Sequence, residues 1–225
     1  MRPLCLWSHW GDGCVVQHND SNKATTRHII SPNAAASNSL RKLEFQCVTW
    51  NLVEAQLLNN ALMTTTTDTS SLSSLMQLEV LILSECLLQD KHMHILSHGL
   101  GNHRSLQHLV LGMNDIGDAG IASFVDGWSQ ESVIRTLDWN MNKISGLGAK
   151  RLLEALPNHT PMDVLVLARN TAIGYDGLKL IGETPAGKKL TSLDLYWVAN
   201  GSNMMMPPAV MPSNKPPKLH KLVKL

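Results

Sequence analysis

The feature that most constrains this chain is a short apolar pattern, L-x-x-L-x-L, that recurs at a fixed interval. Five copies follow one another at intervals of 28 residues, and a sixth lies upstream of them. As units 1 to 6 in chain order, the copies begin at Leu40, Leu78, Leu106, Ile134, Met162 and Leu190. Self-similarity with a constant period predicts a solenoid in which each unit is one structural module.

The first part of each unit is predicted to be a strand and the second part a helix. Positions within a unit are counted as offsets from its first frame residue, so the apolar frame occupies offsets 0, 3 and 5. Further along, apolar residues recur every four residues, as at Leu152 and Leu156, which places them on one face of a helix. Asp118 and Ser145 are expected to act as N-caps, and Pro157 to end the helix at Leu156.

A short strand followed by a helix cannot bury its apolar face alone, so successive units are expected to stack. The predicted fold class is α/β: a curved leucine-rich repeat solenoid with a parallel strand ladder on the concave side and helices on the convex side. At offset 8, a buried amide can bridge the backbones of adjacent units. These structural turn positions are Asn114, Asn142 and Asn170, with Cys86 as a weaker substitute.

The pattern L-x-x-L-x-L-x-x-N-x-I with a 28-residue period resembles the ribonuclease-inhibitor-like leucine-rich repeats, which also occur in NOD-like receptors and in the Ran GTPase-activating protein. The resemblance covers residues 40–195. It implies a non-enzymatic module that binds a protein partner and acts as an adaptor or recognition scaffold. The alternatives are GTPase activation of the Ran type, for which no acidic tail or activating loop is recognisable here, and a receptor fragment without an independent role.

The segments outside the repeats have a different composition. Residues 1–39 are rich in Ser, Asn and Ala, which favours disorder over the alternative of an organelle transit peptide. Residues 64–74 form a Thr/Ser-rich insertion that is expected to be a loop. Residues 196–225 are rich in Pro and Met and predict an extended tail. Because no polar C-terminal cap is recognisable, either the tail folds over the open end or the chain is truncated.

The candidate binding surface is the concave face of the predicted sheet. Side chains alternate along a strand, so offsets 2, 4 and 6 face outward while the frame residues face the core, and offset 7 lies beside them. Exposed apolar and polar side chains there predict a shallow groove for a partner, although β-branched residues also suit a parallel strand without any partner. The candidate partner-binding residues are Ile82, His108, Val110, Met113, Asp138, Met141, Val166, Arg169, Asp194 and Trp197.

Composition argues against several other classes of function. The chain has 19 Lys and Arg against 18 Asp and Glu, and a net charge of +1 is no electrostatic footprint for nucleic acid. No apolar run approaches the roughly 20 residues that cross a bilayer. The four cysteines have no compact disulfide or C-x-x-C spacing, which favours a reducing compartment, and a cytoplasmic location is expected.

No motif in the chain predicts catalysis, a cofactor or a metal. There is no G-x-S-x-G elbow, and the glycines are not followed by G-K-[ST], so they are assigned to turns of the repeat. His94 and His98 have the spacing of two zinc ligands on one helix face, but two ligands are not a site, and a solvated outer face is expected for both. The basic segment from Lys215 to Lys224 is expected to be a solvated tail rather than a lipid contact.

Overall fold

The computed structural model describes residues 40–63, 75–156, 162–184 and 190–198. Strands and helices alternate along these ranges in the order that the repeat predicts. The strands are β1 (Lys42–Gln46), β2 (Val80–Ser84), β3 (His108–Val110), β4 (Thr136–Asp138), β5 (Val164–Val166) and β6 (Ser192–Asp194). The helices are α1 (Leu52–Met63), α2 (Asp90–Asn102), α3 (Asp118–Gly127), α4 (Gly146–Ala155) and α5 (Gly174–Glu183).

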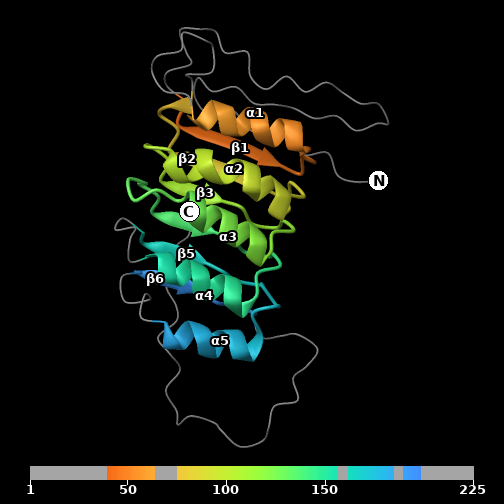
Figure 1. Ribbon diagram of the computed structural model, residues 1–225, viewed down its shortest axis with the longest axis vertical. Helices are drawn as coiled ribbons and strands as arrows, with labels where there is room; N and C mark the ends of the chain where they lie inside the picture. The colour runs from red at the N-terminus through yellow and green to blue at the C-terminus, as the bar shows by residue number, and fades with distance from the viewer. Residues whose placement is uncertain (1–39, 64–74, 157–161, 185–189, 199–225) are drawn as a thin grey trace, which may run out of the picture.

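The strands form one parallel sheet in the sequential order β1 to β6, with the helices stacked in a row along one side of it (Figure 1). The register follows the 28-residue period, so that Leu109 pairs with Leu137 and Leu137 pairs with Leu165. The predicted fold class, an α/β solenoid with a parallel strand ladder on one side and helices on the other, is confirmed. Helices are wider than the strand spacing of about 4.8 Å, so the sheet face turned away from the helices is the concave one.

The core lies between the sheet and the helices and is continuous from unit to unit. The second frame residue of units 2 to 5 is fully buried in each case, and so is the third. In unit 4 the third frame residue is Trp139, whose ring meets Phe124 edge-on with 5.3 Å between centroids. The larger ring fills the space that leucine fills in the neighbouring units, so the pattern tolerates it without breaking the core.

Each strand is held in register by one carbonyl at offset 1 that accepts two backbone hydrogen bonds from the next unit. The carbonyl of Gln107 accepts from the N–H groups of Arg135 and Thr136, at 2.8 and 3.0 Å. The carbonyls of Arg41, Glu79, Arg135 and Asp163 do the same for the unit that follows each of them. A one-residue slip would break both bonds at every such carbonyl, which disfavours any other register.

The helix starts correct one sequence-based expectation. Ser145 is the N-cap of α4, and its hydroxyl oxygen accepts from the N–H of Leu147. Asp118 is not an N-cap: it is the first residue of α3, whose N-cap is Gly117. Its carboxylate instead accepts from the backbone N–H and the hydroxyl of Ser145, 27 residues further on. The carboxylate of Asp118 therefore connects two units and does not cap its own helix.

Asp90 acts in the same way one unit earlier, since its Oδ1 accepts from the N–H groups of Gly117 and Gly120 at 2.7 and 2.9 Å. Both aspartates stand in the first turn of one helix and satisfy free amides at the start of the next. The negative charge also suits the positive end of each helix dipole. Helix α4 ends at Ala155 with Leu156 as its C-cap, one residue before the expected end, and Pro157 lies outside the described ranges.

Glycines set how closely the helices approach one another. A Cβ at Gly101 in α2 would lie 2.2 Å from the carbonyl oxygen of Gly127 in α3. A Cβ at Gly146 in α4 would lie 2.3 Å from the Cα of Gly177 in α5. Backbone atoms cannot move aside as a flexible side chain can, so these helix pairs require the absence of a side chain.

The last described unit is less enclosed than the others. None of the three residues of β6 is fully buried, and Leu193 and Leu195 only pack against the rim of the core. In unit 5, Asn170 and Ile173 are one residue further apart than Asn142 and Ile144 of unit 4, and Gly174 at the start of α5 has a φ of 61°. Residues 196–198 form the turn after β6, while residues 1–39, 64–74 and 199–225 lie outside the described ranges. Within the described ranges, no helix is long and apolar enough to cross a membrane.

Candidate protein-binding face

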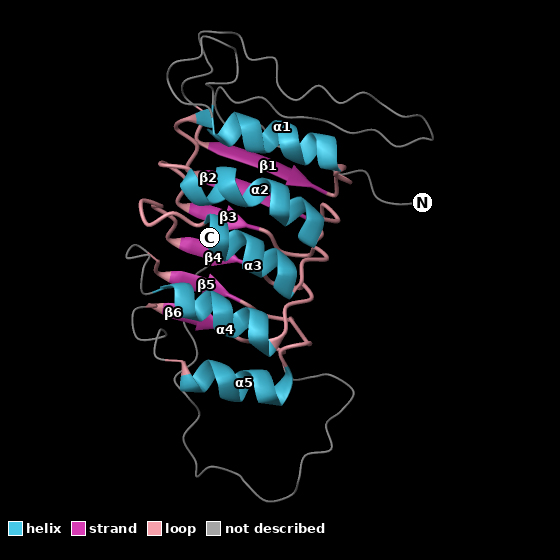
Figure 2. Cartoon of the chain, viewed as in Figure 1, coloured by secondary structure: helices cyan, strands magenta, loops and turns pink. Residues whose placement is uncertain are grey.

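Figure 2 shows the helices along one side of the sheet, and the candidate site is the opposite, concave face, which no helix of the described ranges covers. Strands β2 to β5 share one burial pattern, in which frame residues are buried and the residues on either side are half-buried. Offsets 2 and 4 therefore share this face across the whole ladder. Four candidate residues, Ile82, His108, Val110 and Val166, are placed there by this alternation.

The apolar part of the face follows one row of paired residues. Ile82 of β2 is in register with Val110 of β3, and Val166 of β5 is in register with Asp138 of β4 on one side and Asp194 of β6 on the other. Half-buried β-branched side chains on an uncovered sheet face leave apolar surface in water. Burial of this apolar surface against an apolar surface of another protein would be energetically favourable, because it removes both surfaces from water.

Asp138 and Asp194 have the same local geometry. The Oδ1 of Asp138 accepts from the N–H of Asn140 at 2.8 Å, and the Oδ1 of Asp194 accepts from the N–H of Tyr196 at 2.8 Å. Each carboxylate thereby closes a turn at the end of its strand. Asn140 also donates through its side chain to Asp138 at 2.7 Å. Both aspartates are held in place on the concave face rather than swinging freely.

The offset-7 residues form a second row, called here the exit row, where each strand leaves the sheet. The row comprises Cys47, Glu85, Met113, Met141, Arg169 and Trp197, and every one of them has a positive φ, between 51° and 59°. This conformation is uncommon for residues other than Gly, Asn and Asp. Met113 is 43% exposed, Met141 39% and Trp197 49%. Large side chains therefore stand along one edge of the concave face in spite of a backbone conformation that disfavours them.

Neighbours within the exit row contact one another. The guanidinium Nη1 of Arg169 lies 3.7 Å from the sulfur of Met141, and the rings of Tyr196 and Trp197 meet edge-on at 5.8 Å. At the other end, the carboxylate of Glu85 accepts from Gln46 and from the thiol of Cys47. The row thus runs from an acidic group in unit 2, through two methionines, to a cation and an aromatic pair in units 5 and 6.

The offset-8 amides lie behind the exit row and connect adjacent units. The Oδ1 of Asn114 accepts from the N–H groups of Cys86 and Leu88, both at 3.0 Å, and its Nδ2 donates to the carbonyl of Leu83 at 2.7 Å. Asn142 and Asn170 repeat this arrangement with the units before them. Cys86 offers only its thiol, which lies 3.4 Å from the carbonyl of Phe45. These residues support the surface and take no part in it.

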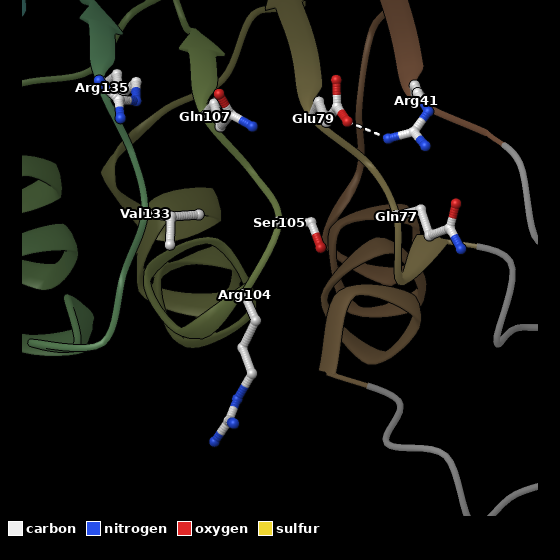
Figure 3. A pocket seen from close by; sticks show the side chains of 8 residues that line it. All are labelled: Arg41, Gln77, Glu79, Arg104, Ser105, Gln107, Val133 and Arg135. Carbon is white, nitrogen blue, oxygen red and sulfur yellow. Dashed lines mark hydrogen bonds and ion pairs between the residues drawn. The ribbon is translucent and has the colours of Figure 1, made fainter. Parts of the chain in front are cut away.

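A polar hollow of about 510 Å³ lies at the opposite edge of the sheet, where the chain re-enters the strands (Figure 3). Sequence reasoning missed it, although its residues Glu79, Gln107 and Arg135 occupy offset 1 of successive units. The arginines are already paired: Arg41 with Glu79, Arg104 with Glu131, and Arg135 with Asp163. Because these pairs are exposed and mutually neutralised, the hollow offers no concentrated charge for a ligand.

The four histidines of unit 2 divide into an exposed pair and a buried pair. His94 and His98 are exposed on the outer face of α2, as expected, and within the described ranges no three potential metal ligands lie together. His103 is buried: its Nδ1 accepts from the N–H of Leu106, and its Nε2 lies 2.9 Å from the carbonyl of Leu75. Burial lowers the pKa of His103, although the bond to Leu75 opposes this. Burial, assisted by the charge of Lys91, also lowers the pKa of His92.

Parts of this chain are similar to known proteins. Residues 102–125 match a family model described as Leucine Rich repeat. The protein has a leucine-rich repeat fold. A solved structure of a tropomodulin C-terminal domain from Caenorhabditis elegans is similar with a TM-score of 0.40 and 10% identity, over 75% of this chain and 85% of that one.

Two curated proteins share sequence with part of this chain. The human protein named Centrosomal protein of 78 kDa is 35% identical over 77 residues, which is 34% of this chain and 11% of that protein. Its mouse counterpart is 30% identical over 100 residues, which is 44% of this chain and 13% of that protein. The aligned part is thus only about a tenth of the length of these relatives.

Proposed function

We propose that this chain is a non-enzymatic adaptor or recognition scaffold that binds a protein partner through its concave face. The observation that carries the proposal is the uncovered sheet face, on which Ile82, Val110 and Val166 are half-buried and the exit row adds exposed methionine and tryptophan. Aromatic residues and methionine are enriched where proteins contact one another. No observation favours GTPase activation over this function.

The 28-residue period and the offset-8 asparagines support a place among the ribonuclease-inhibitor-like repeats. We also propose a cytoplasmic location. Because the two curated relatives are named centrosomal proteins, a centrosome-enriched cytoplasmic extract is the best starting material for finding the partner.

The test is capture from that extract by the tagged full chain and by two double variants. Val110→Lys with Val166→Lys places charge on the concave face. Val53→Lys with Leu147→Lys places the same charges on the outer face of the helices, where both side chains are 68% exposed. We expect the outer-face variant to capture the same proteins as the unmodified chain and the concave-face variant to lose them, as measured by quantitative mass spectrometry.

A third variant distinguishes loss of the binding surface from loss of capture caused by unfolding. Met113→Lys with Met141→Lys changes only exposed side chains of the exit row, so the core stays intact. Circular dichroism and a cooperative thermal transition establish that each variant is folded. If both folded concave-face variants capture the same proteins as the unmodified chain, the concave face is not the binding surface.

A further inference from the structure

The offset-4 residues form one row across the sheet, and five of the six, those of β2 to β6, are taken together because Glu44 of β1 is paired with Lys42. These five are Ile82, Val110, Asp138, Val166 and Asp194, and the strand register places each residue directly beside the next. All five side chains are half-buried. Across the sheet, the chemistry therefore alternates in a defined order: apolar, apolar, acidic, apolar, acidic.

The two carboxylates in this row are not neutralised by the described part of the chain. Among the ion pairs between described residues, none includes Asp138 or Asp194. Glu44, which occupies the same offset in β1, is by contrast paired with Lys42 at 2.9 Å. A fixed and partly buried carboxylate without a counter-charge attracts a cation, and the attraction strengthens when a partner excludes water.

The spacing of the row favours a helix as the complementary shape. Neighbouring strands are about 4.8 Å apart, so the four steps from Ile82 to Asp194 span about 19 Å. A helix that presents a side chain every 3.5 residues on average advances about 5.3 Å per step, or about 21 Å in four steps. An extended peptide advances about 6.7 Å between side chains on one face, or about 27 Å. Only the helix presents side chains at a spacing close to that of the row.

We propose, building on the proposed function, that the concave face binds an amphipathic helix of a partner protein that lies across the strands. Two apolar side chains of that helix contact Ile82 and Val110, and a third contacts Val166. A lysine or arginine meets Asp138, and a second, one heptad away, meets Asp194. The partner is thus recognised by two basic residues seven positions apart with an apolar residue between them.

The exit row sharpens this recognition along one side of the helix. Met113 and Met141 offer adaptable apolar contacts beside Val110 and Asp138. Arg169, the residue of this row in unit 5, forms no ion pair with a described carboxylate and disfavours a third basic residue on that side. Attraction along one row and repulsion beside it together define the rotation of the bound helix.

The probe for this proposal is a side-chain-stapled helical peptide of about 22 residues. It carries Leu, Leu, Lys, Leu and Lys at alternating spacings of three and four residues, with neutral polar residues elsewhere. The matched control peptide has Glu at both Lys positions. Fluorescence anisotropy with the full chain at physiological salt measures both affinities.

We expect the Lys peptide to bind at least about tenfold more tightly than the Glu peptide, a difference of about 1.4 kcal/mol. Asp138→Asn with Asp194→Asn retains an oxygen that closes each turn but removes both charges, and should reduce the preference to less than about twofold. Equal affinity for the two peptides, or a Lys preference that persists in the folded Asn variant, overturns the proposal.

Two further measurements exclude other occupants of the face. Replacing Lys215, Lys218, Lys221 and Lys224 with Gln, which removes their charge without adding an acidic one, tests whether the chain's own basic segment competes for the row. Tighter peptide binding by that variant assigns the face to this segment and overturns the partner helix, while unchanged binding supports it. A dimer seen by analytical ultracentrifugation and abolished by Asp138→Asn with Asp194→Asn also overturns it, while a monomer supports it.

The failures of the two proposals can be told apart. If neither peptide binds, but Val110→Lys with Val166→Lys still abolishes capture of proteins from the extract, the helix inference is wrong and the concave face remains the binding surface. If capture also survives in the folded concave-face variants, both proposals are wrong.

Discussion

The junctions between the central units are tied together in two ways, whereas among the described residues neither tie is present at the junction at the C-terminal end. Between units 3 and 4, Asn142 reaches back to unit 3 and Asp118 reaches forward to Ser145. Between units 5 and 6, Val198 stands at the asparagine position, and a backbone bond from the N–H of Gly174 joins its carbonyl at 3.0 Å. The same apolar frame therefore forms a strand in every unit, but its contribution to stability depends on what lies on either side.

The largest effect is expected from the same truncation in the two regions. Leu137→Ala empties a fully buried site between two neighbouring units and should lower the free energy of unfolding by about 3–5 kcal/mol. Leu193→Ala, in a partly buried site at the rim, should lower it by about 1–2 kcal/mol. Urea denaturation followed by circular dichroism measures both. Equal losses would show that the end unit is as well packed as the centre.

Removing a central amide is expected to have the next largest effect. Asn142→Ala leaves the N–H of Ile116 and the carbonyls of Leu111 and Trp139 without this partner, at a cost of about 2–3 kcal/mol. The matched control is Asn60→Ala, an exposed asparagine on α1 whose side chain accepts from Gln56 of the same helix, which should change stability by less than about 0.5 kcal/mol. Chemical denaturation distinguishes them, and a loss at Asn142 no larger than at Asn60 would contradict the role assigned to the amide bridge.

The same glycine substitution should have opposite signs in the two regions. Gly101→Ala in α2 forces a methyl group against the backbone of Gly127 and should destabilise the fold by about 1–3 kcal/mol. Gly182→Ala in α5 meets no atom within 4 Å and should stabilise it by about 0.5–1 kcal/mol, because alanine favours helix. Thermal unfolding of the two variants gives the signs directly. If Gly182→Ala instead lowered the stability, the space around Gly182 in α5 would be smaller than the structure shows.

The smallest effect is expected from pH and belongs to unit 2. Burial lowers the folded-state pKa of His103 and His92 below the ordinary value of 6.5, so the unfolded chain binds more protons below that pH. Stability should therefore be fully present above about pH 6.5 and decrease as the pH falls below it. Denaturation at a series of pH values with His103→Gln should show a shallower decrease. A slope unchanged in that variant would assign the response to other groups.

The strands and their register could be predicted because the leucine frame is local and repeats, and Leu109, Leu137 and Leu165 lie where the period places them. Asp118 could not be placed correctly, because its partner is 27 residues away and capping rules consider only neighbours in sequence. The left-handed backbone of the exit row was also missed. Glu, Met, Arg and Trp give no local sign of that conformation, since glycine or asparagine is the usual indication.

The hollow around Arg104 and Arg135 was missed for a related reason. Offset 1 is polar in every unit, but the residue types differ, so no motif marks it. The residues of the concave face were easier to predict, because strand alternation alone assigns Asp138 and Asp194 to it. What the alternation does not reveal is that both carboxylates close turns, since that depends on the backbone after each strand.

The positive φ angles of the exit row imply a trade-off that protein engineering can exploit. A left-handed backbone at a non-glycine residue costs about 1 kcal/mol, so five large side chains along that edge are retained at the expense of conformational energy. Glycine at Met113 or Met141 would relax the backbone while removing surface that a ligand could touch. Robustness and affinity can therefore be tuned in opposite directions at one position, without any change to the leucines beneath it.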